Sequence, residues 1–334
     1  MKRATEEALK ILQSHDSFGF LRGAMTNLEL QGEEGLGIGV YFVATSAHQP
    51  YPLRLEIQER TAGTAKYVID KVSKILLPGS VVKLDPASKE DWDRFGVTQH
   101  SNVVVSQWRT EETDGSFIQL DVRPDGVVRA VGRRDDDADR VLVDSERVNG
   151  NFALLSSERY PVWPRPSRWL TMRQKEKAVS KTKPPLPLKD KDFAVWREVQ
   201  RLLKERASIQ VSLPAWEQAV LEDMSRDHNK AVHIPTLIQC WRTMCLLRSF
   251  QSHPQDNVKV LNADFLDLAA AVSLSKRLFR EGKWFVSPTS IFTMISPVGE
   301  RTGLLHPVTG RGVRYEHKRE QLVDRQSLWL APED

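Results

Sequence analysis

Apolar segments of strand length and of helix length alternate along the first half of this 334-residue chain. Alternation of this kind predicts an α/β fold, in which helices pack on the faces of a sheet of buried strands. The turn sequence Pro124-Asp125-Gly126 lies between two apolar runs and predicts a β-hairpin inserted into that fold. The expected strands are 52–57, 81–84, 103–105, 117–122, 127–131, 141–143 and 152–155, and the expected helices are 5–13, 36–46, 66–77 and 85–95.

The second half of the chain has a different character. A segment rich in lysine and proline is typical of a linker, and apolar patterns of helical period follow it at 191–206, 214–226, 234–252 and 263–280. The pattern predicts an N-terminal helical segment (1–46), an α/β core (47–175), the basic linker (176–190), a mainly helical domain (191–281) and a small C-terminal module (282–334). Strand-like pieces beside one short helix suggest a winged helix for that last module.

Several classes of protein are disfavoured by the sequence. No apolar run approaches the ~18 residues that a transmembrane helix needs, and the N-terminus turns polar where a signal peptide would turn apolar. Cys240 and Cys245 are too few for a disulfide framework or a zinc site, and the eight histidines form no metal-binding pattern. We therefore expect a cytoplasmic protein with no metal centre and no membrane partner.

Basic residues are concentrated between Ser157 and Asp190. This stretch holds nine basic and three acidic residues, so its net charge of +6 exceeds the +4 of the whole chain. Aromatic residues are interleaved with its first arginines, and such rings can stack on unpaired bases while the cations neutralise phosphates. The pattern predicts DNA contacts through Arg159, Arg165, Arg173, Lys175, Lys177, Lys181 and Lys183, with a second group, Arg311 and Arg314, in the C-terminal module. The alternative is a solvated linker whose tryptophans belong to the core.

The segment from Leu55 to Tyr67 has the layout of a phosphate-binding loop: a strand, small residues, a lysine and a helix. Gly63, Thr64 and Lys66 are the residues that would hold a nucleotide phosphate. Glu59, however, brings a carboxylate to the start of the loop, Ala65 stands at the second glycine of the motif, and Tyr67 replaces the hydroxyl that binds Mg²⁺. The loop therefore predicts a degenerate nucleotide site.

The order of these features resembles the AAA+ helicase module of phage and plasmid replication proteins, which is related to the minichromosome-maintenance group. The segments that carry the resemblance are Thr5–Leu12, 36–46 with Tyr51-Pro52-Leu53, the loop, Leu77-Pro78, His100–Val105, Pro166-Ser167-Arg168, Val199–Leu203, Ile209–Pro214 and Asn262–Ala269. The resemblance implies a three-layer AAA+ core with ATP and Mg²⁺ as the family's cofactors. It also implies that Arg168 matches an arginine that reaches a neighbouring subunit's γ-phosphate, although a surface arginine beside Trp169 is the alternative.

One part of the family's machinery is missing. In the family, the strand equivalent to 102–105 ends in an Asp-Glu pair that holds Mg²⁺ and polarises water, whereas here Val105 is followed by Ser106-Gln107-Trp108. Asp121, or the pair Asp144 and Glu146, would be a displaced acidic motif if one exists.

Three hypotheses follow from the sequence. The leading one is a catalytically degenerate AAA+ protein, a pseudo-ATPase with no catalytic residue and no bound cofactor. It would bind DNA within a homo-oligomer or a hetero-assembly of a mobile element, a replication system or an antiviral system. The first alternative is an active DNA-dependent ATPase or helicase with an atypical site for ATP and Mg²⁺. The second is a protein–protein scaffold without a nucleic-acid role, its loop packed shut by Glu59 and Tyr67.

Overall fold

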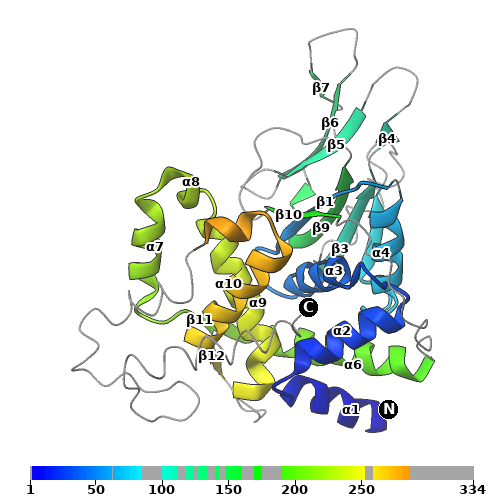
Figure 1. The fold of residues 1–334 in the computed structure, drawn as a ribbon, viewed down its shortest axis with the longest axis vertical. Coiled ribbons are helices and arrows are strands. Elements are labelled where there is room, and N and C mark those ends of the chain that lie inside the picture. The colour runs from blue at the N-terminus through cyan, green and yellow to red at the C-terminus, as the bar shows by residue number, and fades with distance from the viewer. Residues whose placement is uncertain are drawn as a thin grey trace. The chain divides into compact units, whose positions relative to one another are not determined.

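The structure is a computed structural model of the whole chain. It describes residues 2–61, 63–84, 100–107, 109–110, 117–122, 127–133, 140–142, 148–149, 151–158, 169–174, 190–252 and 259–285. The chain divides into two compact units, one of Leu30–Thr182 and one that combines Met1–Glu29 with Lys183–Asp334 (Figure 1). This division differs from the expected boundaries, because residues 30–46 belong with the sheet and the first two helices belong with the C-terminal half.

The unit of Leu30–Thr182 is built on a parallel sheet with the strand order β10-β1-β9-β3-β2. Its strands are β1 (Arg54–Gln58), β2 (Val81–Leu84), β3 (His100–Gln107), β9 (Asn151–Glu158) and β10 (Trp169–Arg173). The predicted mixed α/β fold is thereby confirmed. Since all five strands run the same way, the segments that follow their carboxyl ends meet at one edge of the sheet.

Burial explains why these segments form the centre of the sheet. Leu55 and Ile57 of β1 and Leu155 of β9 are fully buried, as expected for parallel strands covered on both faces. Helix α3 (Glu34–Ser46) contacts β1 and β9 and is enclosed along its length from Leu36, which explains its apolar residues on every side. Helix α4 (Thr64–Ser73) contacts α3 and β9 and buries one stripe, with Val68 and Val72 at its centre.

A second, antiparallel sheet is inserted between β3 and β9. It consists of β4 (Arg109–Thr110), β5 (Phe117–Val122), β6 (Val127–Arg133), β7 (Arg140–Leu142) and β8 (Val148–Asn149). Val122 pairs with Val128 at the end of the β5–β6 ladder, which confirms the predicted hairpin; its turn residues lie outside the described residues. Asp121 pairs with Arg129 inside this ladder and so does not end a strand of the parallel sheet.

The other unit is mainly helical. Its helices are α1 (Lys2–Gln13), α2 (Ser17–Asn27), α6 (Asp190–Arg206), α7 (Glu217–Ser225), α8 (His228–Ala231), α9 (Ile234–Ser252), α10 (Phe265–Leu278) and the 3-10 turn η1 (Glu281–Trp284). Two short parallel strands, β11 (Gln210–Ser212) and β12 (Val260–Asn262), pair beside them. Helix α1 contacts α6 and α9, and the Thr5 hydroxyl donates to the Glu198 carboxylate at 2.6 Å. The expected helix 85–95 and the predicted winged helix lie outside the described residues.

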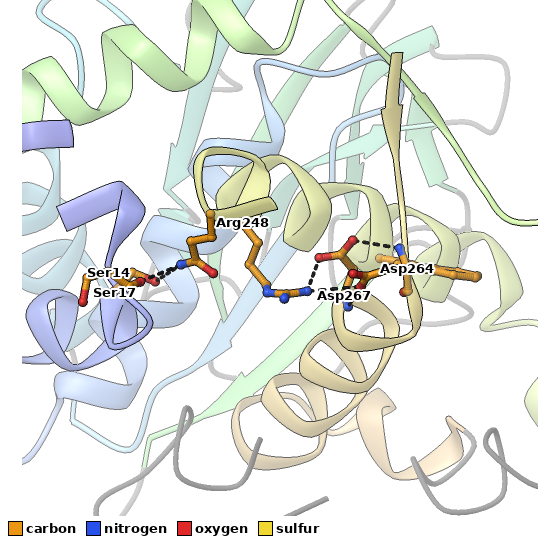
Figure 2. A network of polar contacts seen from close by, with 7 residues as sticks. Ser14, Ser17, Arg248, Asp264 and Asp267 are labelled. Carbon is orange, nitrogen blue, oxygen red and sulfur yellow. Dashed lines mark hydrogen bonds and ion pairs between the residues drawn. The ribbon is translucent and has the colours of Figure 1, made fainter. Parts of the chain in front are cut away.

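A buried arginine joins α9 to the start of α10 (Figure 2). The Arg248 guanidinium pairs with Asp264 at 3.3 Å and with Asp267, while the two aspartates form a reciprocal capping box at the N-terminus of α10. On the same helix, the Gln251 side chain donates to the Ser14 carbonyl at 2.7 Å. In the described part of the chain, no helix combines the length and the apolar character needed to cross a membrane.

Candidate phosphate loop

The candidate site lies where β1 leads into α4. β1 ends at Gln58 and α4 begins at Thr64, with Gly63 as its N-cap residue. Gly63 has φ = 83°, in the left-handed region that glycine adopts without steric cost. This turn aims the first N–H groups of α4 back into the loop, and N–H groups at a helix N-terminus are natural donors to an anion.

The loop supplies its own anion. One carboxylate oxygen of Glu59 accepts a hydrogen bond from the Gly63 N–H at 3.1 Å, and the other accepts from the Ala65 N–H at 2.6 Å. A negative side chain at this place is stabilised both by the hydrogen bonds and by the helix dipole. Two of the N–H groups that could donate to a phosphate here, those of Gly63 and Ala65, are therefore already bonded to Glu59.

A second side chain closes the loop from β10. Gln174 directly follows that strand, and its amide oxygen accepts from the N–H groups of Arg60 at 2.9 Å and Thr61 at 3.0 Å. Its amide nitrogen donates to the Glu33 carboxylate at 3.1 Å, just before α3. Gln174 is buried, and its own N–H extends the β10–β1 pairing to the Gln58 carbonyl at 3.1 Å. The loop is thus bonded on both sides by side-chain oxygens of this unit.

The predicted phosphate-binding residues occupy this loop but do not line an open anion site. The Thr64 N–H donates within the loop to the Thr61 carbonyl at 3.3 Å, and the Lys66 side chain is exposed. Tyr67 is 45% exposed, and the Lys71 ammonium lies 5.3 Å from the centre of its ring. The hydrogen bonds that close the loop therefore come from Glu59 and Gln174, and the packing of Tyr67 against the loop stays a prediction.

The neighbouring strand ends carry few groups suited to ATP hydrolysis. β3 ends at Ser106 and Gln107, neither of which is a carboxylate. Among the last residues of the described strands that neighbour β1, Glu158 of β9 is of carboxylate type, and it is in register with Gln58 of β1. Its place was not evident from the sequence, because the pairing of β9 with β1 depends on a connection that spans most of the unit.

The remaining predicted residues divide by location. Arg173 ends β10, is exposed and is in register with Gln58, which places it beside the loop strand. The other predicted residues lie outside the described residues: Arg159, Arg165, Arg168, Lys175, Lys177, Lys181, Lys183, Arg311 and Arg314, and also Asp144 and Glu146. Among the residues whose placement is described, no three histidine, cysteine, aspartate or glutamate side chains gather closely enough to hold a metal ion.

Comparison with known proteins adds no family. The chain matches no protein-family model and no curated protein sequence.

The role of Gln174 can be tested by stability. The Gln174→Ala change leaves the Arg60 and Thr61 N–H groups without their acceptor and Glu33 without this donor, so we expect a loss of about 1–2 kcal/mol in the free energy of unfolding. Urea denaturation measures the loss. The control is Gln218→Ala on the exposed face of α7, for which we expect less than about 0.5 kcal/mol. A Gln174→Ala loss no larger than the control would contradict this role.

Proposed function

We propose that the protein is a DNA-binding pseudo-ATPase with an AAA+ core, acting within a larger assembly. The observation that carries the proposal is the closed phosphate loop, in which Glu59 and Gln174 accept the N–H groups of Arg60, Thr61, Gly63 and Ala65. The loop lies between a strand and a helix, as in a nucleotide site, but these four N–H groups donate to side chains of the protein. We expect this of an ATPase-like core that no longer binds nucleotide.

The strand order supports the AAA+ part of the proposal. β1, which leads into the loop, lies between β9 and β10, and β3 is one strand further away. AAA+ ATPases have the same order in their parallel core sheet, with the acidic Mg²⁺-binding motif at the end of the strand that corresponds to β3. The antiparallel sheet inserted between β3 and β9 is compatible with this strand order, because β3 and β9 still pair within the parallel sheet.

The loss of turnover has two independent physical causes. Tyr67 stands where a hydroxyl would hold Mg²⁺, and β3 ends in Ser106-Gln107 where a carboxylate pair would bind the metal and polarise water. Phosphoryl transfer depends almost entirely on such positioning and charge neutralisation. Without either group, the site lacks the means to stabilise the transition state even if a nucleotide entered.

A nucleotide titration tests the pseudo-ATPase part. We expect no saturable binding of a fluorescent ATP analogue at high micromolar concentration, with or without Mg²⁺, because the N–H groups of Arg60, Thr61, Gly63 and Ala65 already donate to Gln174 and Glu59. Mg²⁺-dependent binding by the wild-type chain would overturn this part. It would favour the active ATPase, and Lys66→Ala would then be expected to abolish hydrolysis.

A charge-reversal experiment tests the DNA-binding part. Changing Arg165, Lys175, Lys177 and Lys181 together to glutamate removes cations that would neutralise phosphates, so we expect DNA affinity to fall at least about tenfold and to depend less on salt. The matched control reverses Lys2, Lys10, Lys74 and Lys204, which gives the same net charge. Equal affinity in the two variants would remove the basic arm from the proposal. No DNA binding by the wild-type chain would favour the protein–protein scaffold.

A further inference from the structure

A tryptophan lies on the surface at the end of the helical unit. Trp284 closes η1 and is 36% exposed. The His233 ring lies parallel to it with 6.4 Å between ring centres, and the Lys283 ammonium lies 4.9 Å from the centre of the indole. An aromatic face flanked by cations is the arrangement on which unpaired bases stack.

Packing against α10 fixes the position of this tryptophan. Phe285, the next residue, is buried and meets the His233 ring edge-on, with 6.5 Å between ring centres. Gly282 lies so close to α10 that a Cβ atom there would come within 2.1 Å of the Ser275 carbonyl group. The backbone of η1 therefore packs directly against α10, and this packing fixes the position of Trp284.

Two lysines of separate elements are anchored next to this ring by their backbones. The Lys230 carbonyl of α8 accepts from the His233 N–H at 2.9 Å, and the Lys276 backbone nitrogen of α10 lies 2.5 Å from the position that a Cβ atom of Gly282 would take. Partial burial and the positive charge of Lys230 lower the pKa of Lys276. Lys283 adds a third from η1. Nearby acidic groups are Glu281, whose charge acts on His233, and Asp227, which caps α8 by accepting the Asn229 N–H.

The dipole of α10 explains only part of this cluster. Lys276 and Arg277 lie in its last turn, where basic residues are stabilised by the helix C-terminus. Lys230 and Lys283 belong to α8 and η1, so the preference of basic residues for the last turn of α10 does not account for them. The positive charges of Lys230 and Lys276 repel each other, and an anion bound between them would reduce that repulsion.

We propose that the exposed indole and the basic residues around it form a binding surface for single-stranded DNA. The surface consists of Trp284, His233, Lys230, Lys276 and Lys283. A base stacks on the exposed indole in the place now held by the Lys283 ammonium, which moves to the adjoining phosphate. Lys230 and Lys276 take the next phosphate along the backbone. Only an unpaired base can offer its face to the ring, so the surface selects single strands over duplex. The inference rests on the proposed DNA-binding function and adds a contact surface to it.

Fluorescence anisotropy of the full chain with labelled oligo-dT tests the surface. We expect Trp284→Ala to weaken binding about tenfold and Trp284→Phe to retain most of the affinity, because stacking needs a ring. The control is Phe20→Ala, which removes a 51% exposed ring from α2 of the same unit and is expected to bind like the wild type. The double change Lys230→Gln and Lys276→Gln is expected to reduce the salt slope by about 1.4, whereas Lys10→Gln with Lys204→Gln leaves it unchanged.

The outcomes separate this inference from the function on which it rests. Oligo-dT binding that is equal in the wild type and in Trp284→Ala would overturn the surface and leave the DNA-binding function in place. Wild-type binding to duplex but not to oligo-dT would do the same. An absence of binding to both would overturn the surface and the DNA-binding function together. Trp284→Phe and thermal melting of each variant guard against a loss that comes from misfolding.

Discussion

Replacing Glu59 by alanine is expected to give the loop between β1 and α4 an affinity for inorganic tripolyphosphate that the wild-type chain lacks. The change frees the N–H groups of Gly63 and Ala65 at the start of a ten-residue helix. It also removes a carboxylate from the place where a phosphate would bind, and two such charges ~4 Å apart repel by about 4 kcal/mol at an effective dielectric of about 20. We expect a gain on the order of a hundredfold, equivalent to about 2.7 kcal/mol.

Isothermal titration calorimetry with tripolyphosphate measures this gain. Glu59→Gln removes the charge but keeps an oxygen that can accept from the same N–H groups, so it is expected to gain less than Glu59→Ala. Glu222→Ala on the exposed face of α7 changes the net charge equally and is expected to gain nothing. Adding Lys66→Ala to Glu59→Ala is expected to reverse the gain. Weak binding by all variants alike would show that Glu59 does not block the loop.

Much of the fold was predictable because buried parallel strands are recognisable in a sequence. The segment 152–155 is a short apolar run, and 52–57 alternates apolar residues with Arg54 and Glu56; both became strands of the central sheet. The hairpin was predictable for a local reason, since a Pro-Asp-Gly turn between alternating segments specifies its own pairing. Helices α6, α9 and α10 also lie where their apolar periodicity placed them.

The candidate site was predictable only in part. The loop was evident from its spacing, and Glu59 stood out as a carboxylate in it. The direction of that carboxylate, toward the N–H groups of its own loop, depends on the left-handed turn at Gly63. Gln174 could not be found, because it lies 114 residues from Arg60 and reaches the loop only through the pairing of β10 with β1. Nothing in its local sequence distinguishes it from a linker residue.

The domain division illustrates the same limit. The N-terminal helix was expected to belong to a separate segment, whereas Thr5 bonds to Glu198 across 193 residues of sequence. An amphipathic helix shows which face it buries but not which partner covers that face. The buried Arg248 was likewise hidden, since the stripe of apolar residues on 234–252 indicates a core helix and says nothing of an arginine within it.

The largest loss of stability is expected from Arg248→Ala. The arginine side chain is 7% exposed and pairs with two carboxylates, those of Asp264 and Asp267, that also cap α10 through hydrogen bonds of 2.8 and 2.9 Å. Deleting the guanidinium leaves the carboxylates close together with no counter-charge. Breaking a buried ion pair from one side typically costs about 3–5 kcal/mol, and we expect a loss of this size in the free energy of unfolding.

Urea denaturation measures that loss, and the chain offers a matched control. Arg201 also pairs with two carboxylates, Glu198 and Glu205, but it is exposed on α6. Exposed pairs are solvated and screened, so Arg201→Ala is expected to cost less than about 1 kcal/mol. Equal losses in the two variants would mean that burial does not increase the contribution of the Arg248 ion pairs to the free energy of unfolding.

The loss at Arg248 is also expected to depend on pH in a defined direction. Burial, followed by the nearby Asp264 carboxylate, raises the pKa of Asp267 to about 7, and Arg248 opposes both effects. The folded chain therefore holds this proton more tightly than the unfolded chain, so the contribution of Asp267 to stability is full at acid pH and declines as pH rises toward 7. Arg248 stabilises only the ionised carboxylate. The difference between the wild type and Arg248→Ala is consequently expected to be smaller near pH ~5, where the variant loses the Asp264 pair, and to grow toward pH ~8, where Asp267 is charged in the wild type and its pair is lost as well. A difference that stays constant across this range would show that the ionisation of Asp267 does not contribute to the stabilisation by Arg248.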